Sequence, residues 1–334
     1  MATAQREPST EWSEVVDPAE AQRHKAFADE LVKIQSRIDL KHGPGRVFHR
    51  KQVLGLKAAV EILADLPDYA RQGLFSRPAT YEAIARLSNG GMEPQPDAIP
   101  DVRGFAFSIR GLTGPAALGG QTDRQDFALI NRPIFGFHTS EDFAAIAQAA
   151  AQSQAAVMKA FVELYGPTGG PVAAAKMAKD LFRRFTGFAT EPFFSAVPIQ
   201  FGQYAGRLRM HTQGENAHLR AALDFGKDMA ARLAEHAVIY DLQAQFFVDE
   251  TITPIEDGTI DWPEEESPFI DIGVLTLPIQ DPGSAEGIDL SAAVEIDKFD
   301  PWAALLDHKP LGEIMRARKV AYFPSAKHRE ATGT

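Results

Sequence analysis

The stretch RGFAFSIRG (103–111) is the best starting point for predicting the fold. It is short and apolar and is bounded by turn-forming residues, which is typical of a β-strand. Two segments of the same kind lie before and after it, EAIARLS (82–88) and QDFALIN (125–131). The sequence therefore predicts three successive strands in this part of the chain.

Further strand-like runs occur later in the chain. They are AVPIQFGQYAGRLRMH (196–211), HAVIYDLQAQFFVD (236–249) and FIDIGVLTLPI (269–279). At least six strands with helices in the gaps between them favour a closed or nearly closed antiparallel sheet. The predicted fold class is α+β, with a barrel and helices packed on its outside.

Helical patterns separate these groups of strands. A first helix is predicted from about Ala21 to Ile38, and two segments between 141 and 185 are too long for strands. An amphipathic helix is predicted near 217–234. The glycine-rich, aromatic stretch KHGPGRVFHRKQVLG (41–55) is predicted to be a loop or a short strand.

The composition describes a globular chain of 334 residues with 45% hydrophobic and 24% charged residues. There is no cysteine, which excludes disulfides, thiolate nucleophiles and cysteine-bound metals, so any metal must use His, Tyr or carboxylates. No internal repeat or linker divides the chain. We therefore expect a flexible tail over 1–20 and a single domain over 21–330.

Charge and hydropathy limit the partners and the location of the protein. A net charge of -11 argues against nucleic-acid binding, which needs a basic surface. No apolar run is long enough for a membrane span, and the first ten residues, MATAQREPST, lack the apolar core of an export signal. These features predict a cytoplasmic protein.

A lone tyrosine stands among basic residues in RARKVAYFPSAKHR (316–329). Arg318 lies four residues before Tyr322, so on a helix both side chains share one face. A guanidinium against the phenol oxygen would favour the phenolate form. The alternative interpretation is an ordinary solvated basic helix.

Several polar residues stand at the ends of apolar segments and could converge on a dry pocket. His49 follows apolar residues in GRVFHRKQ. Arg86 and Ser88 are two residues apart, so both face one side of a predicted strand, and Asn131 stands at the end of another predicted strand. The alternative for His49 is a histidine of the core or its rim, which is the commoner situation.

Five stretches, in this order along the chain, resemble motifs of the haem catalase superfamily. The stretches are GRVFHRK, RLSNGG, DVRGFAF, NRPIF and RARKVAY, and the resemblance covers most of the chain from 43 to 329. It implies a catalase-like antiparallel β-barrel of about eight strands with packed helices and a buried b-type haem.

The resemblance implies roles on the iron-ligand side and at the edge of the haem. Tyr322 would be the iron ligand, and Arg318 would keep its phenolate charged, which suits ferric iron. Arginines bind carboxylates bidentately. The positions that would bind the haem propionates are Arg46, Arg86 and Arg329.

On the opposite face, the resemblance implies a peroxide-binding site. His49 would act as general base and then acid, with Ser88 orienting its ring, and Asn131 would donate a hydrogen bond to the peroxide. Phe48 and Phe143 would flank this side of the haem. Phe48 stands where catalases typically carry a small aliphatic residue, and ordinary core packing is the alternative for Phe143.

The chain is shorter than full-length catalases, and FPSAKHR (323–329) departs from their pattern after the tyrosine. FDPWAALLDHKPLGEIMRARK (299–319) looks closest to small catalase-like proteins. We therefore predict a haem peroxidase that reduces hydrogen peroxide or organic hydroperoxides, with residual catalase activity. An organic electron donor and a homodimer are expected partners. The alternatives are a fatty-acid hydroperoxide lyase or isomerase, similar to allene oxide synthase, and a non-catalytic haem- or lipid-binding barrel.

Overall fold

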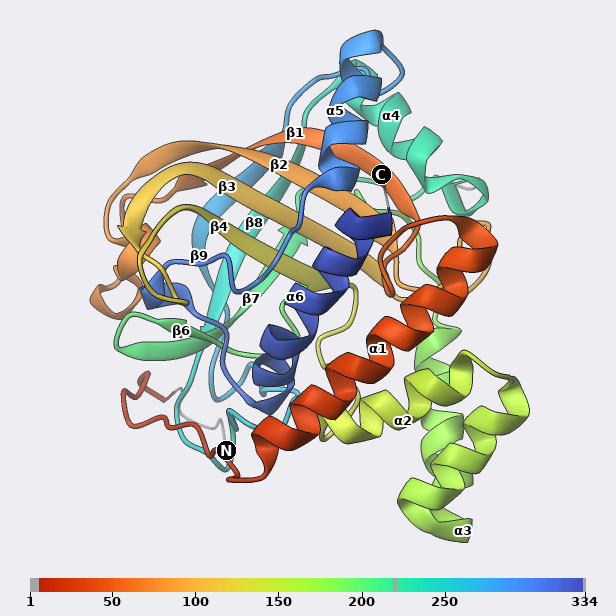
Figure 1. The fold of residues 1–334 in the computed structure, drawn as a ribbon. Coiled ribbons are helices and arrows are strands. Elements are labelled where there is room, and N and C mark those ends of the chain that lie inside the picture. Colours follow the sequence, from red (N-terminus) through yellow and green to blue (C-terminus); the bar gives the residue numbers. More distant parts are fainter. Residues whose placement is uncertain (1–5, 219–220, 333–334) are drawn as a thin grey trace.

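The computed structural model describes residues 6–218 and 221–332, and a closed antiparallel β-barrel lies at its centre (Figure 1). The ring closes because β5 pairs with both β4 and β7, while β1 pairs with both β2 and β9. The eight strands of the ring are β1 (Gln52–Ile62), β2 (Ala79–Asn89), β3 (Arg103–Pro115), β4 (Gln121–Ile130), β5 (Phe193–Phe194), β7 (Tyr204–Thr212), β8 (Val238–Phe246) and β9 (Ile270–Leu277). A short strand, β6 (Ile199–Phe201), pairs with β7 beside the ring.

Strand β3 shows why these sequences form a barrel. Phe105, Phe107 and Ile109 alternate along the strand and are all completely buried. Such alternation places one set of side chains inside the barrel and the other outside. Inside, the ring centroid of Phe105 lies 5.3 Å from that of Tyr240 on β8 and 5.4 Å from that of Phe193 on β5. The interior of the barrel is therefore a packed aromatic core.

Helices lie along one side of the barrel (Figure 1). Helices α1 (Glu20–His42) and α6 (Glu313–Thr332) run side by side, and Leu31 and Ile34 of α1 share an apolar cluster with Ala317 and Ala321 of α6. The other helices are α2 (Ser140–Ala150), α3 (Gln154–Leu181), α4 (Phe225–Glu235) and α5 (Ala285–Ile296). Among the described residues, no helix is long and apolar enough to cross a membrane.

Helix α5 packs unusually close to β1. A Cβ atom added at Gly55 of β1 would lie 2.7 Å from Cβ of Val294, which real Cβ atoms do not tolerate. The glycine therefore allows the end of α5 to approach the strand, and this places Glu295 over the outer face of the barrel.

The sequence predicted most of these elements. The α+β barrel, the helix near 21–38, the helical region from 141 to 185 and all six predicted strand regions are present. The stretch 41–55, predicted to be a loop or a short strand, contains the start of β1, but the extent of this strand to Ile62 was not predicted. The helix predicted near 217–234 is shorter, since α4 begins at Phe225, and positions 219–220 lie outside the described residues.

Residues 6–19 lie against the barrel. The backbone N–H of Ser9 donates to the carbonyl of Phe247 at 2.8 Å, and the indole Nε1 of Trp12 donates to the carbonyl of Gln203 at 2.9 Å. Positions 1–5 of the expected tail lie outside the described residues. The flexibility of the tail and the single domain over 21–330 stay predictions.

Candidate active site

His49 lies on the outer face of the barrel, in the loop that connects α1 to β1. Its backbone N–H donates to the carbonyl of Gly90 at 3.0 Å, and its φ of 50° is rare for a residue other than glycine. The imidazole rests on Gly104 of β3, where an added Cβ atom would lie 2.4 Å from Nδ1 of His49. The glycine in the DVRGFAF stretch therefore leaves the space that the imidazole of His49 occupies.

A short chain of polar groups holds the ring of His49. Its Nδ1 lies 3.0 Å from Oγ of Ser88, and that hydroxyl lies 3.5 Å from the carbonyl oxygen of Gly104. If the hydroxyl donates to the carbonyl, it accepts from Nδ1–H, and the lone pair of Nε2 is then free to accept a proton. The contact between His49 and Ser88 is the one that the sequence predicted.

Burial and nearby cations keep His49 neutral. Burial, followed by the positive charges of Arg86, Arg318 and Arg46 in that order, lowers the pKa of His49 to about 3. These three arginines come from β2, α6 and the loop before β1. Their influence on one imidazole shows that the three separate motifs face a common region.

Arg318 and Tyr322 meet on α6 as their spacing predicted. The guanidinium of Arg318 donates a short hydrogen bond through Nη2 to the phenol oxygen of Tyr322. Its Cζ also lies 5.1 Å from the centroid of the tyrosine ring. The helix thus presents a tyrosine oxygen paired with a cation, next to the region that His49 faces.

Arg46 and Arg86 converge on one carboxylate that sequence reasoning did not identify. Arg46 Nη1 donates to Glu295 Oε1 at 2.7 Å, and Arg86 Nη2 and Nε donate to Glu295 Oε2 at 2.8 and 3.1 Å. Burial lowers the pKa of Arg46 to about 9, and it also lowers the pKa values of Arg86 and Arg329. The charge of Arg329 contributes to the lowering for both Arg46 and Arg86. Burial is therefore the main cause of the lowered pKa values, repulsion between arginines adds to it for Arg46 and Arg86, and Glu295 acts in the opposite direction on all three.

Asn131 has one satisfied and one unsatisfied end. Its Oδ1 accepts a hydrogen bond from the backbone N–H of Arg103 at 2.8 Å, which ties it beside Gly104 at the start of β3. Its amide nitrogen Nδ2 is buried and has no hydrogen-bond partner within the described ranges, 6–218 and 221–332. An unpaired buried donor is costly, so Nδ2 is available to a ligand or a water molecule.

Phe48 and Phe143 lie in contact next to His49. Their ring centroids are 5.1 Å apart, and Phe143 also contacts Phe27, Phe135 and Phe137 at 6.1, 5.3 and 5.4 Å. Phe143 is thus part of an aromatic cluster, as ordinary core packing requires. A role for either ring in contacting a cofactor stays a prediction.

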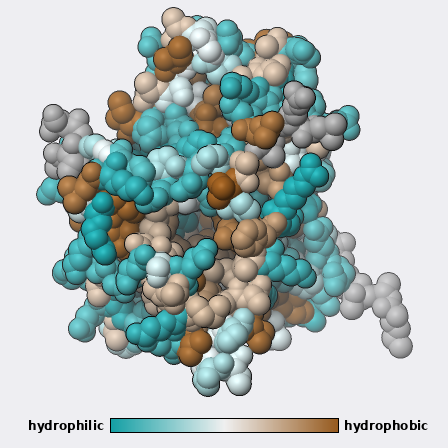
Figure 2. All heavy atoms as spheres, turned by 90° about the vertical axis from the view of Figure 1, so that its right-hand side faces the viewer, coloured by the Kyte–Doolittle hydropathy of each residue, from teal (hydrophilic) through white to brown (hydrophobic). Residues whose placement is uncertain are grey.

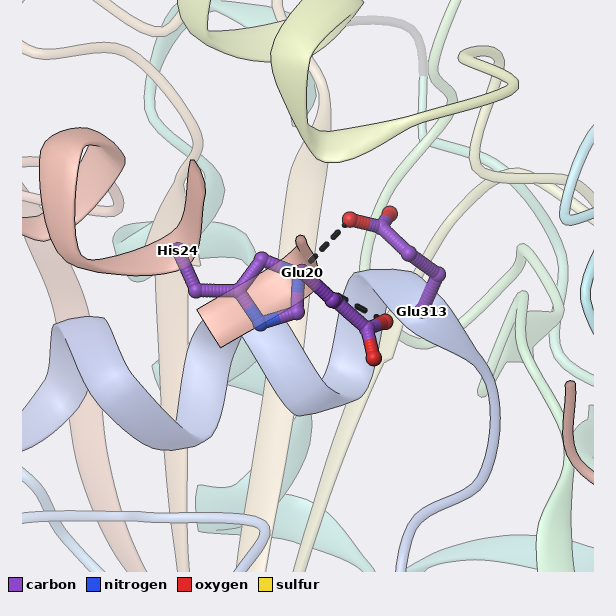
Figure 3. Close-up of side chains that lie close together, drawn as sticks. All are labelled: Glu20, His24 and Glu313. Carbon is purple, nitrogen blue, oxygen red and sulfur yellow. Dashed lines mark hydrogen bonds and ion pairs between the residues drawn. The ribbon is translucent and has the colours of Figure 1, made fainter. Parts of the chain in front are cut away.

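A second polar cluster, which the sequence did not reveal, lies at the start of α6 (Figure 3). The Nε2 atom of His24 lies 2.7 Å from Glu313 Oε1 and 3.7 Å from Glu20 Oε1. The set offers the ligand types of a divalent metal. Both carboxylates, however, already accept hydrogen bonds. The carboxylate of Glu20 accepts from the guanidinium of Arg316 at 2.8 to 3.2 Å, and Oε2 of Glu313 accepts from the backbone N–H of Ser140 at 2.8 Å. Its geometry is that of a saturated ion-pair cluster.

The surface of the molecule has a hollow on the side that Figure 2 presents. Residues of neutral or apolar character surround most of this hollow, and hydrophilic residues lie further out (Figure 2). That side corresponds to the right of Figure 1, where α1, α2 and α3 project from the barrel.

Comparison with solved structures supports the fold. A fungal catalase superposes with a TM-score of 0.69 at 18% identity, covering 88% of this chain and 62% of the catalase. Catalase A from Saccharomyces cerevisiae gives 0.69 at 17% identity, covering 88% and 63%. A bacterial catalase gives 0.66 at 17% identity, covering 87% and 59%. No protein-family model and no curated protein sequence matches the chain. The fold is therefore catalase-like, and the chain spans about three fifths of these catalases.

Proposed function

We propose that this chain is a haem-dependent peroxidase that reduces hydrogen peroxide or organic hydroperoxides. The observation that carries the proposal is the convergence of the His49–Ser88 pair and the Arg318–Tyr322 pair on one region lined by arginines. This arrangement occurs on a catalase-like barrel. Fold alone leaves the reaction open, so the proposal depends on these side chains.

The residues present fit a haem. Arg86 is a buried cation and Arg46 and Arg329 are partly buried ones, and burial lowers the pKa values of all three, so an added anion would favour their charged forms. Haem brings two carboxylates, and guanidinium groups bind carboxylates bidentately. The unpaired Nδ2 of Asn131 is able to donate a hydrogen bond to a bound peroxide. Tyr322 offers an oxygen ligand of the kind that ferric haem accepts.

Each residue would then have a defined task. Tyr322 would hold the iron, and Arg318 would stabilise the negative charge of its oxygen. Bound haem would supply an iron centre that a peroxide oxidises and an electron donor reduces. The neutral Nε2 of His49 would accept the proton of the bound peroxide and deliver it to the oxygen that leaves as water or alcohol. Asn131 would stabilise negative charge on the peroxide through Nδ2.

Reduction by an external donor is the main reaction of this proposal, and dismutation is a residual one. Dismutation needs a narrow dry site that selects a second small peroxide. The chain spans about 59 to 63% of the catalases that it resembles in fold. A cytoplasmic location and a homodimer stay predictions from the sequence.

The test is to load the purified protein with haem and add an organic hydroperoxide, with and without an electron donor. We expect consumption that depends on the donor and yields the alcohol. Consumption without a donor, with a rearranged product, would instead identify a lyase or isomerase. An unchanged haem spectrum after peroxide addition would identify a non-catalytic barrel, and oxygen release from hydrogen peroxide would measure the residual catalase activity.

A further inference from the structure

We propose that Glu295 is a displaceable countercharge for Arg46 and Arg86 and that it gives way to a haem propionate when the cofactor binds. In this role Glu295 keeps the two arginines in place before haem arrives and lowers the affinity for haem. The inference rests on the proposed haem-dependent function, and it concerns a residue outside the motifs that suggested that function.

The carboxylate of Glu295 occupies the positions that an incoming carboxylate would need. One oxygen contacts Arg46 Nη1 at 2.7 Å, and the other contacts Nε and Nη2 of Arg86 at 3.1 and 2.8 Å. The Nε and Nη2 edge of an arginine is one that binds a carboxylate with two hydrogen bonds. A propionate and Glu295 therefore compete for the same donors.

The arginines are held by backbone contacts, and the side chain of Glu295 is more exposed than either of them. The side chains of Arg46 and Arg86 are 13% and 4% exposed, whereas that of Glu295 is 37% exposed. Arg46 is also held by the carbonyl of Glu295 at 2.8 Å, and Arg86 by the carbonyl of His49 at 2.9 Å. These backbone contacts remain when the carboxylate of Glu295 leaves.

Water lies within reach of the displaced carboxylate. Glu295 is the second-last residue of α5, where the helix dipole disfavours a negative charge. Its place is therefore maintained by the two arginines rather than by the helix. Once a propionate neutralises them, rotation of the side chain into solvent removes the repulsion between two carboxylates.

The test compares haem binding by the full chain and by Glu295→Gln, which removes the charge and keeps the size of the side chain. We expect the variant to bind haem about threefold to tenfold more tightly, because the competing ion pair is lost. The dissociation constant is read from a Soret titration of apoprotein, and the rate of haem loss from transfer to apomyoglobin. The apoprotein of the variant should melt at a lower temperature, so affinity and stability change in opposite directions.

Glu286→Gln is the matched control, because Glu286 lies on the same helix and pairs with the exposed Lys57. It should leave haem affinity unchanged. Glu295→Asp serves as a second variant if Glu295→Gln does not fold, and its shorter side chain should also raise the affinity because it cannot reach both arginines. Unchanged or weaker haem binding in a folded Glu295 variant would overturn this inference alone. A wild-type protein that fails to bind one haem per chain would overturn the proposed function as well.

Discussion

Two charged clusters near α6 differ in how well their charges are balanced. At the start of the helix, Arg316 contacts the carboxylates of Glu14, Glu20 and Glu256 at distances of 2.7 to 3.2 Å. Burial would lower the pKa of Arg316, but the hydrogen bonds with Glu256, Glu20 and Glu14 raise it well above its ordinary value. In this cluster three carboxylates surround the guanidinium of Arg316.

The cluster around Glu295 has the opposite balance. Arg46, Arg86 and Arg329 have lowered pKa values there, and Glu295 is the carboxylate that contacts the first two. A saturated cluster such as that of Arg316 ties segments together, because each charge already has its partner. A cluster in which burial lowers the pKa values of arginines is suited to receive an anion, because added negative charge favours the protonated guanidinium, and groups with perturbed pKa values gather at such functional sites.

Tyr322→Phe should have the largest effect, because it removes the phenol oxygen to which the guanidinium of Arg318 donates. We expect loss of stable haem binding or a displaced Soret band, with peroxidase activity reduced to background. Absorption spectra of the haem-loaded protein provide the measurement. Tyr165→Phe is the control, since the hydroxyl of Tyr165 donates to Asp142 on α2. An unchanged spectrum for Tyr322→Phe would exclude Tyr322 as ligand.

His49→Gln should retain haem and lose peroxide reactivity by about a hundredfold or more, as expected for loss of a general acid–base. Stopped-flow mixing with a hydroperoxide would measure the rate. His211→Gln is a control on the exposed face of β7. A rate within a factor of about two of the wild type would move the proton-transfer role to another residue.

Gly104→Ala should displace the imidazole without removing it. The new Cβ atom would lie 2.4 Å from His49 Nδ1 and 2.8 Å from Ser88 Oγ, so one of the two side chains must move. We expect a loss of activity of about tenfold and of about 1–3 kcal/mol in the free energy of unfolding. Gly169→Ala, whose Cβ would meet only an ordinary contact of 3.5 Å, is the control. Wild-type kinetics in Gly104→Ala would show that the position of His49 does not depend on the absence of a side chain at residue 104.

Sequence reasoning found the residues that short motifs carry and missed those that depend on distant contacts. The four-residue spacing of Arg318 and Tyr322 specified their contact, because helix geometry is local. Arg86 and Glu295, by contrast, are separated by 209 positions, and no local pattern marks the glutamate. The extent of strand β1 beyond Gly55 was missed, and the reason for that glycine is the approach of α5.

Arg316→Met tests the saturated cluster. Removing the cation leaves three carboxylates with fewer donors, so we expect a loss of about 2–4 kcal/mol in the free energy of unfolding and no change in haem affinity. Chemical denaturation and a Soret titration would measure the two quantities. Arg71→Met, which breaks an exposed pair with Asp68, should cost less than about 1 kcal/mol.

The same comparison predicts the response of Glu20, His24 and Glu313 to metals. Because hydrogen-bond donors already occupy their carboxylates, EDTA and added zinc should both leave the melting temperature unchanged. A melting temperature that EDTA lowers and zinc restores would show that these residues form a metal site, and the cluster would then no longer serve as the saturated reference.

A change of pH is expected to act on stability through His49. Its pKa of about 3 in the folded protein lies below the value of about 6.5 for an unfolded histidine. Between these values the unfolded chain binds a proton that the folded protein does not, so the contribution of His49 to stability falls as pH decreases from 6.5 toward 3 and is constant above 6.5. His308, with a pKa of about 4, acts in the same direction, so the comparison must be between wild type and His49→Gln.

We therefore expect the free energy of unfolding of wild-type apoprotein to fall more steeply between pH 6.5 and 4.5 than that of His49→Gln. The rate of peroxide reduction should stay level over the same interval, because the imidazole remains neutral and able to accept a proton. A rate that declines with a midpoint near 6.5 would mean that the desolvation and the three arginines do not act on His49 in the working enzyme. In that case a bound anion has balanced the arginine cluster more completely than Glu295 does, and the contrast between the two clusters would hold only before the cofactor binds.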